Sequence, residues 1–211
     1  MHFDYTASYQ NDERERLQML FIQYFLSNDK SGLRKQYKTL RRLELNHNVD
    51  YDNEIIDISS ITENISVACD ILLSDTGVSV IYCGNKTSHA VCNKRYFIKA
   101  LLNLISNAYL YGCENLITIK VIEMADFIRV EVLNGGVFIN SNTGKGLNFV
   151  QKVCAHSNGK FFIEQTTTST RAVMIFEKSR DYKELNHIDF YSLINDRLSP
   201  VYIELFGMEY H

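Results

Sequence analysis

Two asparagines one helical turn apart, Asn103 and Asn107, are the side chains of this sequence best placed to act together. They lie in a segment, 97–112, whose apolar residues recur at helical spacing: Phe97, Ala100, Leu101, Leu104, Ile105 and Ala108. The spacing predicts a buried helix that presents both carboxamides in one direction. Oxygen ligands at positions i and i+4 suit a hard cation such as Mg2+, which takes its other ligands from water and nucleotide phosphates. Two asparagines on a solvated helix face are the alternative interpretation.

Two glycine motifs follow the asparagines along the chain. Asn134, Gly135 and Gly136 come directly after a predicted strand, and the segment 144–148, Gly-Lys-Gly-Leu-Asn, opens a predicted helix. Glycines at the start of a helix let backbone N–H groups approach a phosphate. The side-chain oxygen of Asn134 can accept a hydrogen bond from an amino group. A Gly-Gly turn that merely leaves a strand explains 134–136 equally well.

The elements that must position these motifs predict an α+β fold. Apolar and polar residues alternate over 116–122 and 127–133, as in the strands of a sheet with one covered face. The predicted elements are helices at 57–74, 97–112 and 147–155 and strands at 78–82, 116–122, 127–133, 160–165 and 171–176, with a loop at 85–93. Their order predicts a two-layer α/β sandwich in which helices cover a mixed sheet.

The string Asn-Leu-Ile-Ser-Asn-Ala-x-x-Tyr over 103–111 resembles the asparagine box of sensor histidine kinases, in the superfamily that includes gyrase-type ATPases and a heat-shock chaperone. The two glycine motifs resemble the boxes that follow it in that family, so that the resemblance spans about 57–177. It implies a site for ATP in which Asn107 binds the Mg2+ that bridges the phosphates. The residues implied at the nucleotide are Asn103, Asn107, Asn134, Gly136, Gly144, Gly146 and Leu147.

Departures from the family pattern bear on this site. Asn103 falls where hydrolysing relatives keep a general-base Glu, which implies slow ATP hydrolysis. Leu110 replaces a Lys that touches a phosphate, and Asn134 replaces the Asp that binds the adenine amino group. Only seven residues, 137–143, stand in place of a long lid. The resemblance therefore implies weak phosphate binding and an exposed nucleotide, and complete loss of ATP binding is the alternative.

Amphipathic helices at 12–27 and 31–45 predict a helical hairpin within an N-terminal unit, 1–50. Its core is too small to stand alone, so it must pack on the rest of the chain or on a second copy. In histidine kinases and sporulation-type phosphotransferases such a hairpin dimerises and carries a phosphoacceptor His. By resemblance the acceptor position here is Asn11, whose carboxamide cannot take up a phosphoryl group. His47 is the nearest substitute, although a capping role at the end of the second helix is sufficient to explain it.

Composition limits the class of protein. A chain of 211 residues with 45% hydrophobic content can bury one sizeable core, and its net charge of -3 favours neither nucleic acid nor an anionic membrane as partner. The five cysteines are odd in number and form no Cys-x-x-Cys motif, which indicates buried thiols in a reducing cytoplasm. No apolar run is long enough to span a membrane, and the N-terminus does not resemble a signal peptide. A cytoplasmic location is therefore expected.

A C-terminal extension, 179–211, follows the predicted ATPase-type unit, 51–178. An amphipathic helix is predicted at 187–198, ended by Ser199 and Pro200, which is the only proline in the chain. The tail at 201–206 is apolar enough to require burial. It is predicted to cover its own domain, and a partner or dimer surface is the alternative.

Together these features predict a cytoplasmic, histidine-kinase-like signalling protein that binds ATP and Mg2+ and lacks the usual phosphoacceptor His. Its expected partners are a response regulator or a partner kinase, and a second copy of the chain bound through the N-terminal helices. The alternative is a degenerate docking module, or a histidine phosphotransferase, that binds such a partner without using ATP. Whether the protein is an enzyme stays open; if active, it is a histidine-kinase-type phosphotransferase that works by in-line phosphoryl transfer.

Overall fold

The computed structural model describes residues 16, 19, 20, 23, 24, 29–45, 52–85, 87–136, 145–181 and 190–207. The predictions made for Asn11, His47, Gly144 and the short lid at 137–143 lie outside these residues. So does most of the first predicted helix, 12–27. The described residues include both asparagines of the predicted site and the elements on either side of them.

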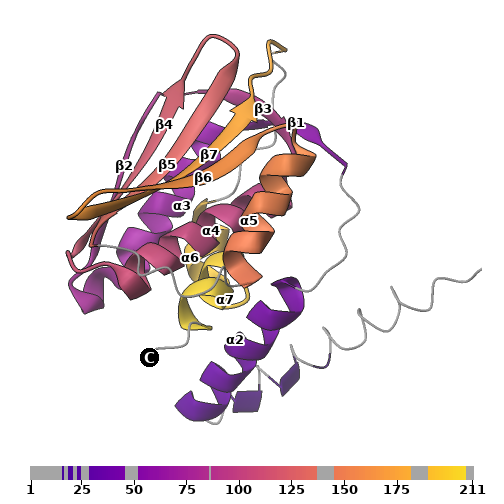
Figure 1. Ribbon diagram of the computed structural model, residues 1–211. Coiled ribbons are helices and arrows are strands. Elements are labelled where there is room, and N and C mark those ends of the chain that lie inside the picture. The colour runs from indigo at the N-terminus through magenta and orange to yellow at the C-terminus, as the bar shows by residue number, and fades with distance from the viewer. Residues whose placement is uncertain are drawn as a thin grey trace, which may run out of the picture.

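A five-stranded mixed sheet, in the order β2-β4-β5-β7-β6, forms one layer of the fold (Figure 1). β2 (Ser79–Gly84) pairs in parallel with β4 (Leu116–Glu123). The other pairs are antiparallel: β4 with β5 (Phe127–Gly135), β5 with β7 (Ser169–Glu177), and β7 with β6 (Lys160–Gln165). The mixed sheet expected from the sequence is confirmed, and each of its strands overlaps a predicted segment.

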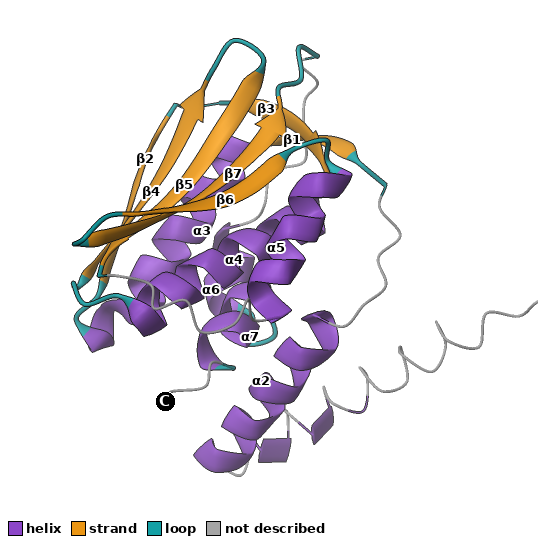
Figure 2. Ribbon diagram, viewed as in Figure 1, coloured by secondary structure: helices purple, strands orange, loops and turns teal. Residues whose placement is uncertain are grey.

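Three helices cover one face of this sheet: α3 (Ile58–Leu73), α4 (Lys94–Tyr111) and α5 (Lys145–His156) (Figure 2). Asp57 caps the start of α3 and Asn93 caps the start of α4, each through a side-chain oxygen that accepts a backbone N–H. The α+β sandwich predicted from the order of the elements is therefore confirmed.

The core lies between the sheet and the helix layer. Alternate residues of β5, namely Ile128, Val130 and Val132, are buried on the helix side. Phe97 of α4 and Phe176 of β7 meet edge to face in this core, with ring centroids 5.5 Å apart, and both are fully buried. One face of α4 is thus held on the sheet, and its other faces are left for contacts with α5 and with the candidate site.

A second sheet of two strands is not predicted by the sequence pattern. β1 (Glu54–Asp57) pairs antiparallel with β3 (His89–Cys92). The prediction of a loop at 85–93 is therefore wrong for its second half, which forms β3. Each strand has only four residues and mixes polar with apolar side chains, so neither shows a strand pattern by itself. The pairing joins segments that are far apart in sequence, which local patterning cannot reveal.

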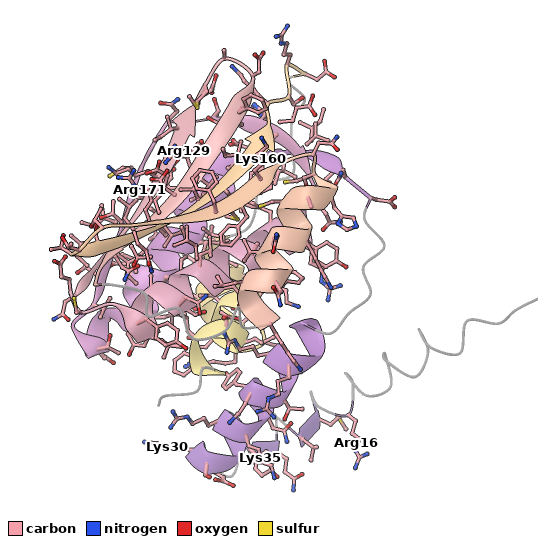
Figure 3. The ribbon with its side chains drawn as sticks, viewed as in Figure 1. Arg16, Lys30, Lys35, Arg129, Lys160 and Arg171 are labelled. Atoms are coloured by element: carbon pink, nitrogen blue, oxygen red, sulfur yellow. The ribbon has the colours of Figure 1, made fainter. Side chains whose placement is uncertain are left out.

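The face of the sheet away from the helices carries charged side chains on β5, β6 and β7, among them Arg129 and Arg171 (Figure 3). Glu131 of β5 is buried there between Arg129 and Arg171. Both arginines also pair with Glu164, at 3.4 and 3.1 Å, so that two cations balance two anions. The Arg129 guanidinium lies 5.8 Å from the ring centroid of Phe162. This face is covered by its own side chains, and the candidate site lies on the helix side.

Glu123, at the end of β4, provides a test of pH dependence. Its carboxylate contacts the Lys178 ammonium at 2.5 Å and accepts a hydrogen bond from the Ser88 hydroxyl at 3.0 Å. The hydrogen bond from Lys178 is the main reason that the folded-state pKa of Glu123 lies below its ordinary value. The resulting stabilisation is complete above the unfolded-state pKa and is lost as the pH falls through the folded-state pKa.

We expect Glu123→Gln to lower the free energy of unfolding by about 1 kcal/mol at neutral pH, because the ion pair is partly exposed. The difference from wild type should shrink as the pH falls through the folded-state pKa of Glu123, which lies below its ordinary value. Urea unfolding of both proteins at neutral and acid pH measures this difference in the free energy of unfolding. Glu177→Gln is the matched control, because Glu177 is an exposed carboxylate at the end of β7. A difference that persists unchanged in acid would contradict this role of the Glu123 carboxylate.

Three helices lie beyond the helix layer, away from the sheet: α2 (Lys30–Leu45), α6 (Phe190–Asn195) and α7 (Pro200–Phe206) (Figure 1). α6 contacts α3, while α7 contacts both α4 and α2. The extension therefore covers its own domain, as predicted. Its predicted helix bounds are wrong, because Pro200 begins a separate helix that Ser199 caps. Within the described ranges, no helix is long and apolar enough to cross a membrane.

Candidate functional site

Asn103, Asn107 and Tyr111 follow one another on successive turns of α4. A helix rises about 1.5 Å per residue, so Asn107 lies about 6 Å along the axis from each of the other two. The turn at Asn103 touches α5 at Gly146, and the end of α4 touches the end of β5 at Gly136. The two glycine motifs thus reach α4 on either side of Asn107.

α5 packs closely on α4 at Gly146. A Cβ atom there would lie 2.5 Å from Oδ1 of Asn103, so glycine permits an approach that a larger residue would obstruct. Asn103 is fully buried; its Nδ2 donates to the backbone carbonyl of Lys99 at 3.2 Å, and its Oδ1 has no hydrogen-bond partner among the residues that the structure describes. The alternative of two asparagines on a solvated helix face is wrong for Asn103, because α5 covers that part of α4.

The first turn of α5 is the part of the site suited to an anion. The leading N–H groups of a helix have no acceptor within it, and the helix dipole adds positive potential at this end. Lys145 is exposed at the first position and Gly146 is half-buried. The Leu147 side chain is buried in the core, so only its backbone N–H is suited to meet a phosphate.

Asn107 stands between these contacts with its carboxamide half-buried. Its side chain makes no hydrogen bond to any residue that the structure describes. Such a carboxamide offers an oxygen to a metal ion. Nowhere in the described ranges do three or more His, Cys, Asp and Glu side chains gather so that they could hold a metal. A metal ion at Asn107 would therefore take most of its ligands from a bound nucleotide and water.

The end of β5 meets the last turn of α4. A Cβ atom on Gly112 would lie 3.4 Å from Nδ2 of Asn134, which donates to the Gly135 carbonyl at 3.1 Å and leaves Oδ1 as an acceptor. Gly136 leaves the strand with φ of 107°, and a Cβ there would lie 3.0 Å from Sγ of Cys113. The turn by itself requires Gly136, so it is the Asn134 oxygen that could recognise a ligand.

Two further residues bear on the charge of the site. Leu110, where the kinase pattern has a phosphate-contacting Lys, is half-buried against the core. Lys99, which the sequence analysis did not single out, is buried with its Nζ 5.1 Å from the ring centroid of Phe149 on α5. The sequence could have indicated Lys99, because it is a lysine on an apolar helix, one turn before Asn103. Its side chain lies in the interface between α4 and α5.

Comparison with known proteins finds likeness in structure. No protein-family model and no curated protein sequence matches the chain. The chain resembles the catalytic domain of histidine kinase ThkA, with a TM-score of 0.54 and 18% identity over 60% of this chain and 97% of that one. It also resembles full-length ShkA in complex with AMPPNP, with a TM-score of 0.63 and 13% identity over 85% and 46% of the two chains. For ThkA in complex with the response regulator TrrA, the TM-score is 0.57 and the identity 16%, over 82% and 57% of the chains.

These identities are low, so the likeness is one of fold. The chain has the fold of a histidine kinase catalytic domain, a mixed sheet covered by helices, which confirms the fold predicted from its motifs. Nearly all of the ThkA catalytic domain is matched, and the remainder of this chain has no counterpart in that domain. The chain spans about half the length of the two longer kinase chains that it matches.

Proposed function

We propose that this chain is a histidine-kinase-like signalling protein whose ATPase-type domain binds Mg-ATP. One observation carries the proposal: Asn107 lies on α4, without a hydrogen-bond partner among the described residues, between the contact with Gly146 and the end of β5. The likeness of fold to the ThkA catalytic domain, and to ShkA with its AMPPNP, supports this assignment.

Each part of the nucleotide would meet one feature of the site. The phosphates would lie at the start of α5, where Gly146 and Leu147 offer backbone N–H groups; Gly144, which the motif also implies, lies outside the described residues. Asn107 would bind Mg2+ beside them. Oδ1 of Asn134, which its own hydrogen bond leaves available as an acceptor, would accept from the amino group of adenine.

The same arrangement predicts slow hydrolysis. Asn103 has no basic group and is enclosed between two helices, so it cannot activate water for attack on ATP. If the γ-phosphoryl group is transferred, the protein would act mainly by positioning it in line with the acceptor while Mg2+ neutralises its charge. Asn11 cannot be that acceptor, so we propose an acceptor on a partner protein, with His47 as the alternative within the chain.

We propose a response regulator or a partner kinase as that protein, with the cytoplasm as the site of action. The structure of ThkA in complex with the response regulator TrrA supports this kind of partner for a chain of the same fold. Self-association through the N-terminal helices, which the sequence predicts, belongs to the same proposal.

A docking module without phosphoryl chemistry is the second candidate, and two features of α4 favour it. Leu110 packs on the core instead of offering a cation, and Asn103 is enclosed. A chain with both changes can keep the fold and use it to bind a partner. Nucleotide binding decides between the two candidates.

Calorimetric titration of Mg-ATP and Mg-ADP into the full chain tests the proposal. We expect wild type to bind and to gain thermal stability with nucleotide, because a ligand of the native state stabilises that state. Asn107→Ala should lose at least about tenfold in affinity. Asn195→Ala, an exposed asparagine at the end of α6, should bind as wild type does. No heat and no thermal shift at millimolar nucleotide would leave the docking module as the function.

The expectation of buried cysteines is wrong for Cys83 and Cys113, which are exposed at the end of β2 and just after α4. The thiol of Cys113 gives an independent measurement, because it is exposed beside Gly136. Burial raises the pKa of the three enclosed thiols, Cys69, Cys92 and Cys154, the last to about 12, so they stay protonated and unreactive. Iodoacetamide should label mainly Cys113 and Cys83, which is exposed on β2. Mg-ATP should slow labelling at Cys113 alone; unchanged labelling at both would contradict a nucleotide at the end of β5.

A further inference from the structure

The apolar residues of α2 have a partner within the same chain. Leu33, Tyr37 and Leu40, which we call the apolar stripe of α2, pack in one cluster with Tyr202 and Ile203 of α7. Tyr37 and Leu40 are buried. These are all the apolar side chains of α2 that the structure describes. Over 30–42, where the structure describes its side chains, α2 therefore has no further apolar side chain to offer another helix.

Aromatic and polar contacts fix the position of α2 on α7. The Tyr37 hydroxyl donates to the Arg197 carbonyl at 3.0 Å. Its ring lies 5.8 Å from that of Phe206, which stacks in turn on Tyr202 at 5.3 Å. The Arg197 guanidinium covers Tyr202, 4.8 Å from the ring centroid. Together, this hydrogen bond and these ring contacts fix the orientation of α2 relative to the domain.

Glu204 of α7 joins three helices at one buried carboxylate. Its Oε1 lies 2.7 Å from Nη2 of Arg41 on α2 and accepts a hydrogen bond from the Ser106 hydroxyl of α4 at 2.6 Å. Its side chain is 5% exposed, so the carboxylate has lost most of its hydration. A buried charge that loses its partner is strongly unfavourable. The ion pair therefore opposes any movement of α2 away from α7 while Glu204 stays buried.

α7 is part of the domain, whereas α2 is an added helix. Val201 and Leu205, on the inner side of α7, belong to the main core together with the residues of α3, α4 and the sheet. Tyr202, Ile203 and Phe206 form the outer side, and we call this surface, with Glu204, the α7 platform. Removing α2 would uncover the platform and leave the main core in place.

The charge of α2 limits how a second copy can approach it. α2 has six basic residues and one acidic residue, a net charge of +5, although the whole chain carries -3 and the rest of it therefore -8. Lys30 and Lys35 point away from the domain (Figure 3). Two such cationic surfaces repel each other. Over 30–42, two copies of α2 can therefore pair only through their apolar stripes, which α7 already covers.

We infer that the α7 platform holds α2 in cis and so keeps the apolar stripe of α2 out of a dimer. The inference rests on the self-association included in the proposed function and is independent of nucleotide binding. Release of α2 exposes the stripe to water, and burial against the stripe of a second copy is then favourable. The C-terminal extension thus decides whether the N-terminal helix belongs to its own domain or to an assembly.

Hydrogen exchange and light scattering on the full chain test whether the α7 platform holds α2 in cis. Wild type should have the mass of one chain and protected α2 amides. Arg41→Met should speed exchange of the α2 amides about tenfold and raise the mass toward two chains as concentration increases. Arg42→Met, an exposed neighbour on α2, is the control for loss of a positive charge. Arg41→Met with Glu204→Met replaces the ion pair by apolar groups and should restore both wild-type properties.

Three outcomes would overturn the inference. The first is a wild-type protein with the mass of two chains. The second is unchanged exchange of the α2 amides in Arg41→Met. The third is an equal acceleration of exchange in β4 and β5, because the variant would then loosen the whole domain and not α2 alone. Loss of nucleotide binding, which bears on the proposed function, would alter none of these measurements.

Discussion

Phe97→Ala is expected to lower the free energy of unfolding by about 4 kcal/mol. The ring of Phe97 is fully buried between α4 and the sheet and meets Phe176 at a centroid distance of 5.5 Å. The loss combines the transfer free energy of the ring with the cavity that its neighbours cannot fill. A domain is typically stable by only about 5–15 kcal/mol, so this variant should lose a large part of its stability.

Unfolding in guanidinium chloride, followed by circular dichroism, measures this difference. Phe97→Leu is the matched control, because it keeps most of the apolar volume and is expected to cost about 1 kcal/mol. A loss below about 1 kcal/mol for Phe97→Ala would contradict the packing of α4 on the sheet. Since Phe97 fixes the helix that carries Asn107, the same measurement reports on the scaffold of the candidate site.

The packing of α4 could be predicted from the sequence because each buried position carries its own local signal. The helical spacing of Phe97, Leu101 and Leu104 identifies the buried part of the helix, and all three side chains lie in the core. β4 and β5 could be predicted for a similar reason, since a sheet covered on one side requires alternate apolar residues. Local periodicity was sufficient for the elements that build the sandwich.

Elements stabilised by distant contacts could not be predicted in the same way. β1 and β3 are short and become recognisable only through their pairing. The start of α7 is a different case, since Ser199 and Pro200 are as typical of a helix start as of a helix end. Ser199 Oγ accepts from the Tyr202 N–H at 3.4 Å, so the signal was present and its direction was misread.

The candidate site was harder to predict than the fold, as Asn103 illustrates. Helical spacing assigned one face of α4 to the sheet and left the others for solvent or ligand. Two more helices cover those faces: α5 encloses Asn103, and α7 covers Ser106 through Glu204. Which helix packs on which face depends on residues far apart in sequence. Of the two predicted asparagines, only Asn107 keeps an accessible carboxamide.

Gly146→Ala is expected to lower the free energy of unfolding by about 2 kcal/mol and the affinity for Mg-ATP by at least about tenfold. The added methyl group would lie 2.5 Å from Oδ1 of Asn103, so α5 must move away from α4 or Asn103 must leave its position. Either change shifts the start of α5 relative to Asn107. The backbone N–H groups proposed for the phosphates and the proposed Mg2+ ligand would then no longer converge.

Asn103→Ala removes the opposing oxygen, so the double variant should recover at least about 1 kcal/mol relative to the sum of the single losses. Urea unfolding of the four proteins measures this coupling, and calorimetric titration of Mg-ATP measures whether affinity returns with it. Purely additive losses would show that the two positions do not oppose each other across the α4–α5 interface. Recovered stability without recovered affinity would support the packing of α5 on α4 and would count against a phosphate site at the start of α5.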